Sequence, residues 1–290
     1  MVCSVNNNND RQAITKQFLS ELVNRVRLYS VSSLPKYIID LVGFRLPIVR
    51  KKSLNMHFRY KLKNGVIFVV RPFKFDRYII DEIFLEGAYF PDRDFKIEDG
   101  DVVVDVGAHI GVFTVFSARN ADCTVYSYEP RPDNFELLKE NVSLNKIEAC
   151  VKTFQFAVGG VSGSLEFCMD AEGLGQIGGS NGNKIIVRTV TLKEILDSNN
   201  LLKVNFLKID VEGEELEMLL NFPKEYFPRI EKIAMESHTE SITSQLTSYL
   251  SSNGFNVKTL KLPKSNMSML YAKNNNYYDC LSRKTNMVLN

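Results

Sequence analysis

From residue 101 onward, apolar segments of strand length alternate with segments whose apolar residues recur at helical spacing. Strands are expected at 102–106, 124–128, 151–158, 204–209, 231–236, 255–260 and 267–272, and helices near 111–119, 133–145, 190–198, 213–221 and 239–252. Such alternation is typical of an α/β fold, a mostly parallel sheet with helices on both faces. Only PKSN joins the last two strands, which is too short for a helical crossover, so we expect an antiparallel last strand in a seven-stranded sheet.

Residues 1–100 lack this alternation. We expect residues 1–56 to form a helical extension, with a helix that begins after Asp10. Residues 57–100 are predicted to form a β-hairpin around Asn64-Gly65 and a helix that lead into a core domain at 101–290. Segments 164–169 and 184–189 resemble a hairpin inserted in that core. A basic run at Arg45, Arg50, Lys51 and Lys52 either contacts an anionic partner or is a solvated charge run.

Composition excludes several classes of protein. The 290 residues carry a net charge of only +2, which gives no overall electrostatic footprint for nucleic acid. The five cysteines form no C-x-x-C pair, so neither a zinc site nor a disulfide framework is expected. The N-terminus does not resemble a signal peptide, and the apolar run at 37–44 is too short to span a bilayer. We therefore expect a cytoplasmic protein without a transmembrane segment.

The first core strand ends in a glycine turn of the form D-x-G-x-x-x-G, with Asp105, Gly107 and Gly111. The turn lacks the closely spaced glycine pair of a dinucleotide site and the Lys-Ser/Thr ending of a phosphate loop. S-adenosylmethionine carries no phosphate and presents an ammonium and a cationic sulfonium. An acid at the strand end suits that ammonium, and Gly107 lets the backbone approach a ligand closely.

The second core strand ends at Glu129, 24 residues after Asp105. An acid at this position of a β-α-β unit accepts hydrogen bonds from both ribose hydroxyls, which suits S-adenosylmethionine and NAD alike. Only the combination of Glu129 with the glycine turn favours S-adenosylmethionine over NAD. The predicted cofactor-binding residues are Asp105, Gly107, His109, Gly111, Glu129, Pro130 and Ala157.

Six segments resemble the FkbM-type methyltransferases in order and spacing: VVDVGAHIGVFTVFSA, YSYEPRPDNFELLKENVSLN, FAVGGVSGSLEF, VTLKEIL, FLKIDVEGEELEML and AMESH. The resemblance covers roughly residues 58–272. It implies a Rossmann-like class I methyltransferase fold and S-adenosylmethionine-dependent O-methylation of natural products or glycans. His109 stands where that family commonly has Asn, and Lys193 where it commonly has Asp.

Catalytic candidates lie at the ends of the fourth and fifth core strands. LKIDVEGEE places Asp210 at a strand tip and Glu212 just beyond it, although Glu212 also suits a helix N-terminus. AMESH places Glu236 and His238 on one face, and neutral His238 is the preferred general base. Asp210, Glu212 and Glu236 would also provide oxygen ligands for a divalent metal ion. Lys208 is expected to pair with Asp210 or with an acidic acceptor.

The favoured function is O-methylation of a hydroxyl on a small molecule, lipid or glycan by in-line transfer from S-adenosylmethionine. A nucleic-acid methyltransferase is the second hypothesis. The near-neutral charge and the lack of an N-P-P-Y-like motif count against it. A non-catalytic S-adenosylmethionine-binding protein is the third, and a nicotinamide-dependent oxidoreductase comes last. The acceptor and the oligomeric state are not assigned.

Overall fold

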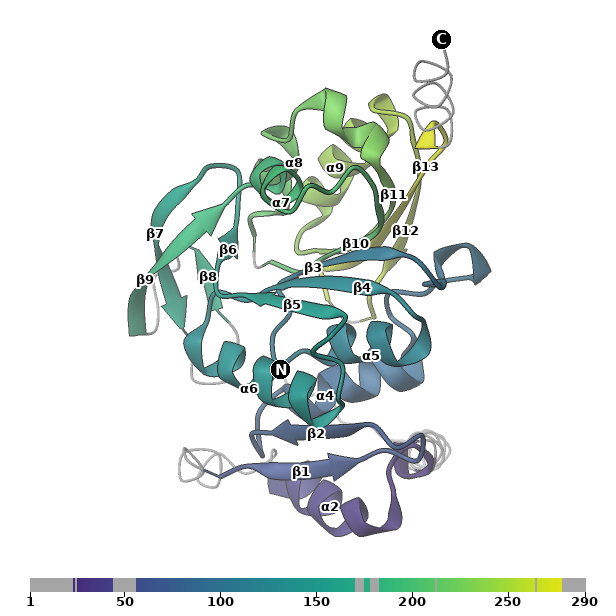
Figure 1. The fold of residues 1–290 in the computed structure, drawn as a ribbon, viewed down its shortest axis with the longest axis vertical. Coiled ribbons are helices and arrows are strands. Elements are labelled where there is room, and N and C mark those ends of the chain that lie inside the picture. The colour runs from purple at the N-terminus through teal and green to yellow at the C-terminus, as the bar shows by residue number, and fades with distance from the viewer. Residues whose placement is uncertain are drawn as a thin grey trace, which may run out of the picture. The chain divides into compact units, whose positions relative to one another are not determined.

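The computed structural model describes residues 23, 25–43, 56–169, 175–177, 183–211, 213–263 and 265–277. The chain forms two compact units, Met1–Glu86 and Gly87–Asn290 (Figure 1). The predicted boundaries at residues 56 and 100 stay predictions. The helix expected after Asp10 and the basic run at residues 45–52 fall almost wholly outside the described residues.

The N-terminal unit is built around an antiparallel hairpin. Strands β1 (Phe58–Lys61) and β2 (Ile67–Val70) pair with Phe58 opposite Val70, and Gly65 in the connecting turn has a φ of 88°. Before them come a 3-10 turn (Val31–Ser33) and helix α2 (Leu34–Gly43). After them comes α4 (Asp76–Asp81), which continues as a π-helical turn (Glu82–Glu86). The predicted hairpin and the helix that follows it are both confirmed.

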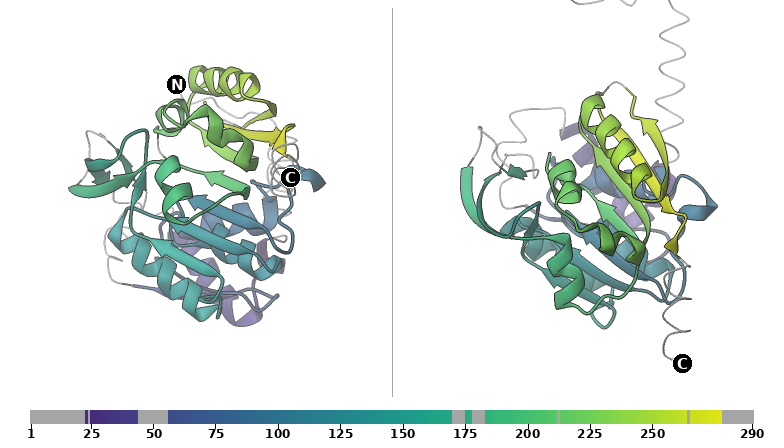
Figure 2. Two further views of the ribbon diagram at one scale, coloured as in Figure 1. Left: turned by 45° about the horizontal axis from the view of Figure 1, so that its top comes forward. Right: turned by 90° about the horizontal axis from the view of Figure 1, so that it is seen from above.

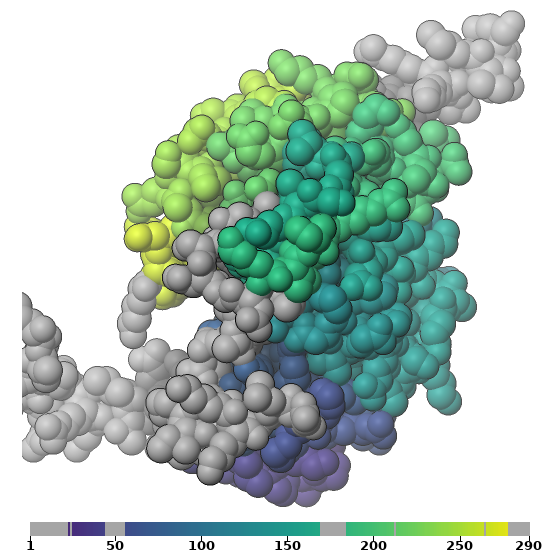
Figure 3. Space-filling model, turned by 90° about the vertical axis from the view of Figure 1, so that its left-hand side faces the viewer, coloured from purple at the N-terminus to yellow at the C-terminus, as the bar shows by residue number. Residues whose placement is uncertain are grey.

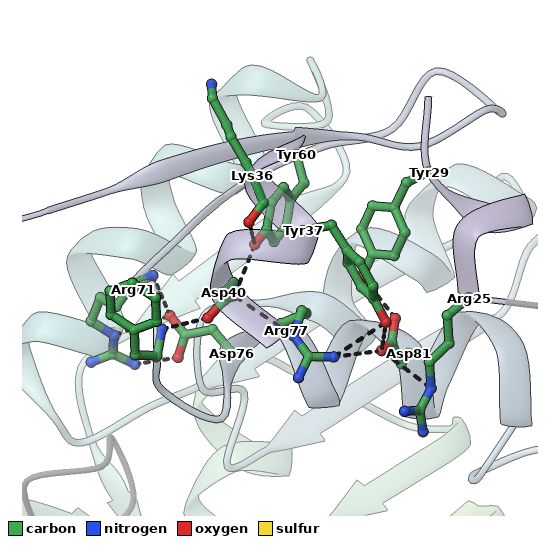
Figure 4. Close-up of polar contacts among 11 residues, drawn as sticks. Arg25, Tyr29, Lys36, Tyr37, Asp40, Tyr60, Arg71, Asp76, Arg77 and Asp81 are labelled. Carbon is green, nitrogen blue, oxygen red and sulfur yellow. Dashed lines mark hydrogen bonds and ion pairs between the residues drawn. The ribbon is translucent and has the colours of Figure 1, made fainter. Parts of the chain in front are cut away.

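A buried charge network holds the N-terminal unit together (Figure 4). Arg77 on α4 is fully buried, and its guanidinium lies 3.0 Å from Asp81 and 3.7 Å from Asp40 on α2. The Asp40 carboxylate also accepts a hydrogen bond from Tyr60 on β1 at 2.8 Å. Burial raises the pKa of both aspartates, and the charge of Arg77 opposes that rise. The network thus joins α2, β1 and α4 through charged groups that each need a partner.

The C-terminal unit contains a seven-stranded sheet in the order β12-β13-β11-β10-β3-β4-β5. Neighbours from β11 to β5 are parallel, whereas β13 is antiparallel to both β11 and β12. The prediction of a mostly parallel sheet with an antiparallel last strand is therefore confirmed. The strands are β3 (Val102–Val106), β4 (Thr124–Tyr128), β5 (Val151–Phe154), β10 (Val204–Ile209), β11 (Ile230–Ser237), β12 (Phe255–Lys261) and β13 (Ser268–Asn274).

Helices cover both faces of this sheet (Figures 1 and 2). Helices α5 (Val112–Asn120) and α6 (Pro132–Leu144) lie on one face, and α7 (Leu192–Ser198), α8 (Glu215–Leu220) and α9 (Glu240–Ser252) on the other. Because side chains alternate along a strand, Val104 and Val106 join the core beneath α7, α8 and α9. Asp105 points the opposite way, toward α5.

A second sheet inserts between β5 and α7, in the order β6-β9-β7-β8. Its strands are β6 (Ala157–Val158), β7 (Gly163–Met169), β8 (Gly175–Ile177) and β9 (Asn183–Val190). Strands β7 and β9 form the predicted hairpin and lie at the surface in Figure 3. The expectation of one strand over 151–158 is wrong, because residues 157–158 leave the main sheet and pair with β9.

Candidate active site

Four predicted site residues lie at or just beyond the carboxyl ends of adjacent parallel strands. Gly107 follows β3, Glu129 follows β4 and Asp210 follows β10, while Glu236 is the last residue but one of β11. Strands β4, β3, β10 and β11 are consecutive neighbours in the sheet. The carboxyl edge of a parallel sheet is where α/β enzymes bind their ligands. The topology thus brings these four residues to one edge.

The glycine turn is shaped by the backbone of the neighbouring strand end. Gly107 has a φ of 77°, and its N–H donates to the carbonyl of Tyr128 at 3.0 Å. A Cβ on Gly107 would overlap the backbone oxygen of Asp210. The close approach of this turn to the Asp210 backbone therefore requires glycine at position 107, whether or not a ligand also approaches the turn. Gly111 has a φ of 85° and caps α5, where a Cβ would overlap the Leu138 side chain.

We expect Gly107→Ala to destabilise the fold far more than Gly100→Ala, which is the matched control. Gly100 has a similar φ of 84°, but nothing lies within 4 Å of a Cβ built there. The control reports only the cost of a left-handed backbone, about 1–2 kcal/mol. The overlap with Asp210 should add at least about 2 kcal/mol. Urea unfolding measures both variants, and equal losses would show that the approach to Asp210 is not tight.

Glu129 is buried and surrounded by N–H donors. Its carboxylate accepts hydrogen bonds from the backbone N–H of His109 at 2.8 Å, from that of Arg131 at 2.9 Å and from the Asn134 amide at 3.3 Å. Burial raises the pKa of Glu129 to about 7 even though these three bonds oppose the rise. The Arg131 guanidinium is held by Asp133, at 2.6 Å from Nε to Oδ1. A ribose hydroxyl would therefore meet a carboxylate that is already oriented.

Lys208 holds the predicted acid at the end of β3. Its ammonium lies 3.2 Å from Asp105 and 3.4 Å from Asp210, and it donates to the Gly107 carbonyl at 2.6 Å. Asp105 is fully buried and also accepts from Thr114 on α5 at 2.6 Å. Burial alone would lower the pKa of Lys208, but the carboxylates outweigh it and raise that pKa to about 12. The expected pairing of Lys208 with Asp210 is observed.

Tyr89 joins the two catalytic candidates at the ends of β10 and β11. Its hydroxyl lies 3.2 Å from the Asp210 carboxylate and 3.4 Å from that of Glu236. Tyr89 is buried against Phe113, with ring centroids 5.4 Å apart. Because a phenol carries one proton, it donates to one of these two carboxylates at a time. Asp210 is partly open, with 32% of its side chain exposed, whereas Glu236 is nearly enclosed.

His238 contacts Glu215, whereas its spacing in the sequence grouped it with Glu236. Its Nδ1 lies 2.6 Å from Oε1 of Glu215, a fully buried residue at the start of α8. The same carboxylate accepts from the backbone N–H of Gly213 at 3.4 Å, in the turn that follows Asp210. A carboxylate at this distance favours the imidazole tautomer with the proton on Nδ1, which makes Nε2 the basic nitrogen.

The predicted metal site stays a prediction, because one of its three ligands lies outside the described residues. Among the described residues no group of three His, Cys, Asp or Glu side chains is arranged to hold a metal ion. Asp210 and Glu236 instead share the Tyr89 hydroxyl. Glu212, the third predicted ligand, lies outside the described residues.

The remaining predicted residues have varied surroundings. His109 has a φ of 52° and reaches Glu129 through its backbone N–H. Pro130 directly follows Glu129, and Ala157 is buried on β6 in the inserted sheet. Glu215 was missed as a site residue, since an acid in the first turn of a helix is common. Its position just after the D-V-E-G motif is the only sequence signal for it.

The chain matches the family model described as the methyltransferase FkbM domain over residues 105–257, just over half of its length. The matched range includes all of the predicted site residues and also Lys208 and Glu215. It excludes Tyr89 and the whole N-terminal unit.

Named relatives and solved structures are also similar to this chain. It is 31% identical over 127 residues to the hexuronic acid methyltransferase AglP of Haloferax volcanii, across 43% of this chain and 51% of AglP. It thus spans about half of that relative. It is 26% identical to the 31-O-demethyl-FK506 methyltransferase FkbM of Streptomyces tacrolimicus, across 62% of this chain and 82% of that protein. A structure of M. capricolum TrmK with S-adenosyl-homocysteine aligns at a TM-score of 0.42 and 13% identity, over 63% of this chain and 66% of TrmK.

Proposed function

The chain belongs to the FkbM methyltransferase family, and we propose that it transfers a methyl group from S-adenosylmethionine to a hydroxyl of a small molecule, lipid or glycan. Two relatives support an acceptor that is a small molecule or a glycan. One acts on a hexuronic acid, and the other is a 31-O-demethyl-FK506 methyltransferase. Free thiols at Cys123, Cys150 and Cys168 support a reaction in the cytoplasm.

The charge of the sheet edge carries this proposal. Lys208 lies among the carboxylates of Asp105, Asp210 and Glu236, and all three raise its pKa. Together these four side chains hold more negative than positive charge, which favours a cationic ligand. A sulfonium cofactor fits such a site, whereas the pyrophosphate of a dinucleotide would be repelled. The edge therefore suits S-adenosylmethionine better than NAD.

We assign the cofactor contacts to the turn after β3 and to the end of β4. Glu129 accepts from the ribose hydroxyls beside the N–H groups that already orient it. Gly107, His109 and Gly111 shape the turn, while Pro130 and Ala157 are proposed to contact the adenosine. Asp105 is fully buried and acts on this turn through Lys208, which donates to the Gly107 carbonyl.

The bound methyl donor supplies an electrophilic methyl group on a positively charged sulfur. His238 takes the proton of the acceptor hydroxyl, because Glu215 orients its ring and stabilises the imidazolium that forms. Asp210 and Glu236 position the acceptor, and the buried Tyr89 hydroxyl holds these two carboxylates in place. Asp210 and Glu236 would also be available as two oxygen ligands if a divalent metal ion takes part.

We expect the affinity for S-adenosylmethionine to fall about tenfold between pH 8 and pH 6. Burial raises the pKa of Glu129 to about 7, and only the ionised carboxylate accepts two ribose hydroxyls. Protonation therefore competes with binding below pH 7, while binding is insensitive to pH well above it. Calorimetric titrations across this range measure the change. Glu129→Gln should bind weakly at every pH, and a wild-type profile without a step near pH 7 would contradict the role of Glu129.

The acceptor is best sought with the purified protein. Mass spectrometry would first identify any ligand that co-purifies with it. Tritiated methyl transfer would then be tested on hydroxylated lipids, glycans and metabolites, with RNA as a separate arm. Transfer to a hydroxyl supports the proposal. Transfer to RNA favours a nucleic-acid methyltransferase, and cofactor binding without transfer to any acceptor favours a non-catalytic binding protein.

A further inference from the structure

Helix α2 carries an apolar stripe on the side that faces away from the core of its own unit. Residues 35, 38 and 42 recur every three or four positions, so they share one face of α2, and Val31 lies in the 3-10 turn that leads directly into this helix. Val31, Ile38 and Val42 are 81%, 51% and 54% exposed, and Ile39 at the edge of the stripe is 55% exposed. The opposite face is the one that holds the buried network, through Tyr37 and Asp40. The fold of this unit therefore does not use the stripe.

The charge of the chain is divided unequally between its two units. Residues 1–86 contain 15 Lys and Arg against 7 Asp and Glu, a net charge of +8. Residues 87–290 contain 21 against 27, a net charge of −6. In the described part of the N-terminal unit, the exposed charged residues are Arg27, Lys36, Arg59, Lys61, Lys63 and Glu86. The near-neutral total thus conceals a strongly basic unit.

We propose that the apolar stripe of α2 and the turn before it, made of Val31, Pro35, Ile38, Ile39 and Val42, docks the N-terminal unit on an anionic lipid surface. Aliphatic side chains would enter the boundary between headgroups and acyl chains, and the cations would face the headgroups. Lys36 lies beside Ile39 on the helix and is exposed. In the described part of the chain no helix is long and apolar enough to cross a bilayer, so α2 would lie along the surface.

Charge favours lipid over the two other candidate occupants. A second copy of this chain would bring another unit of net charge +8 to the same face, which opposes association. RNA would suit the cations, but Val, Ile and Pro offer no aromatic ring on which bases stack. Residues 44–55 lie outside the described residues, and the docking surface is defined without them.

Vesicle flotation tests this proposal and needs neither cofactor nor acceptor, so its outcome is independent of the proposed function. The full chain is mixed with vesicles of phosphatidylcholine alone, or with about one third phosphatidylglycerol. We expect binding to the anionic vesicles, weakened as NaCl rises from about 0.1 to 0.5 M because salt screens the headgroups. The variant Ile38→Ser/Val42→Ser should bind at least about tenfold more weakly, since it removes two aliphatic side chains that would be buried in the bilayer.

The matched control is Val161→Ser/Leu260→Ser, which removes a Val and a Leu of similar exposure, 61% and 57%, from the C-terminal unit. This control should bind vesicles like the wild type. Equal losses in the two double variants, or no wild-type binding to anionic vesicles, would overturn the proposal. So would a wild-type dimer in sedimentation analysis that Ile38→Ser/Val42→Ser dissociates, or RNA binding that the same variant abolishes. If that variant fails to fold, flotation of the wild type across the two lipid compositions and the range of NaCl concentrations still tests the proposal.

Discussion

Lys208→Met is expected to lower the free energy of unfolding by about 3–5 kcal/mol at neutral pH. The lysine is only 3% exposed in the free protein and lies 3.2 Å from the fully buried Asp105. Without it, the Asp105 carboxylate must stay ionised in a dry site or take up a proton, and both are costly. The Gly107 carbonyl also loses its 2.6 Å donor. Urea unfolding at pH 7 measures the change.

Two further variants separate charge from packing at Lys208. The double variant Asp105→Asn/Lys208→Met removes both charges and should recover about half or more of the lost stability. Lys258→Met removes an exposed lysine that pairs with Asp92 at 2.9 Å, and it should cost far less stability than Lys208→Met because solvent screens the pair. If the double variant is as unstable as Lys208→Met alone, the lysine acts through packing and the electrostatic account of this edge is wrong.

His238→Ala is expected to reduce kcat by about 10²–10⁴-fold on an identified acceptor, the range for loss of a general base. The affinity for S-adenosylmethionine should hardly change, because His238 follows β11 and contacts Glu215 on α8, whereas the proposed cofactor contacts follow β3 and β4. Glu215→Gln should cause a smaller loss of kcat, since it weakens the orientation of the ring but keeps the imidazole. Radiolabelled methyl transfer measures both variants.

The control for His238 is His57→Ala, which removes an exposed histidine from the N-terminal unit. It should leave kcat unchanged. The pH profile of kcat should also differ between the wild type and His238→Ala, because the variant lacks the proposed base. Turnover that survives in His238→Ala with an unchanged pH profile would remove the histidine from the mechanism.

Hydrophobic periodicity was sufficient to predict most of the core domain. Its central strands β10 and β11 are buried on both faces and read as short apolar runs. The short PKSN link forced the last pair to be antiparallel. The single strand expected at 151–158 was wrong because periodicity does not reveal which neighbour a strand pairs with. Residues 157–158 pair with a strand some thirty residues later in the chain.

Side-chain pairing was much harder to predict than strand position. The contact of Lys208 with Asp105 depends on the register of two strands a hundred residues apart, in which these residues are direct partners. His238 and Glu236 were grouped by their spacing, yet the imidazole contacts Glu215 on a helix. The buried network around Arg77 was not foreseen, because isolated charged residues in a sequence usually lie on the surface.

Binding of S-adenosylmethionine to the wild type and to Glu129→Ala, followed by calorimetry at pH 8, tests the central claim most directly. The account predicts a single site in the wild type and a loss of affinity of about 10–100-fold in the variant. That range corresponds to about 1.5–3 kcal/mol for hydrogen bonds to a charged acceptor. Absence of binding by the folded wild type, or equal affinity in both proteins, would contradict a methyl-donor site at this edge of the sheet.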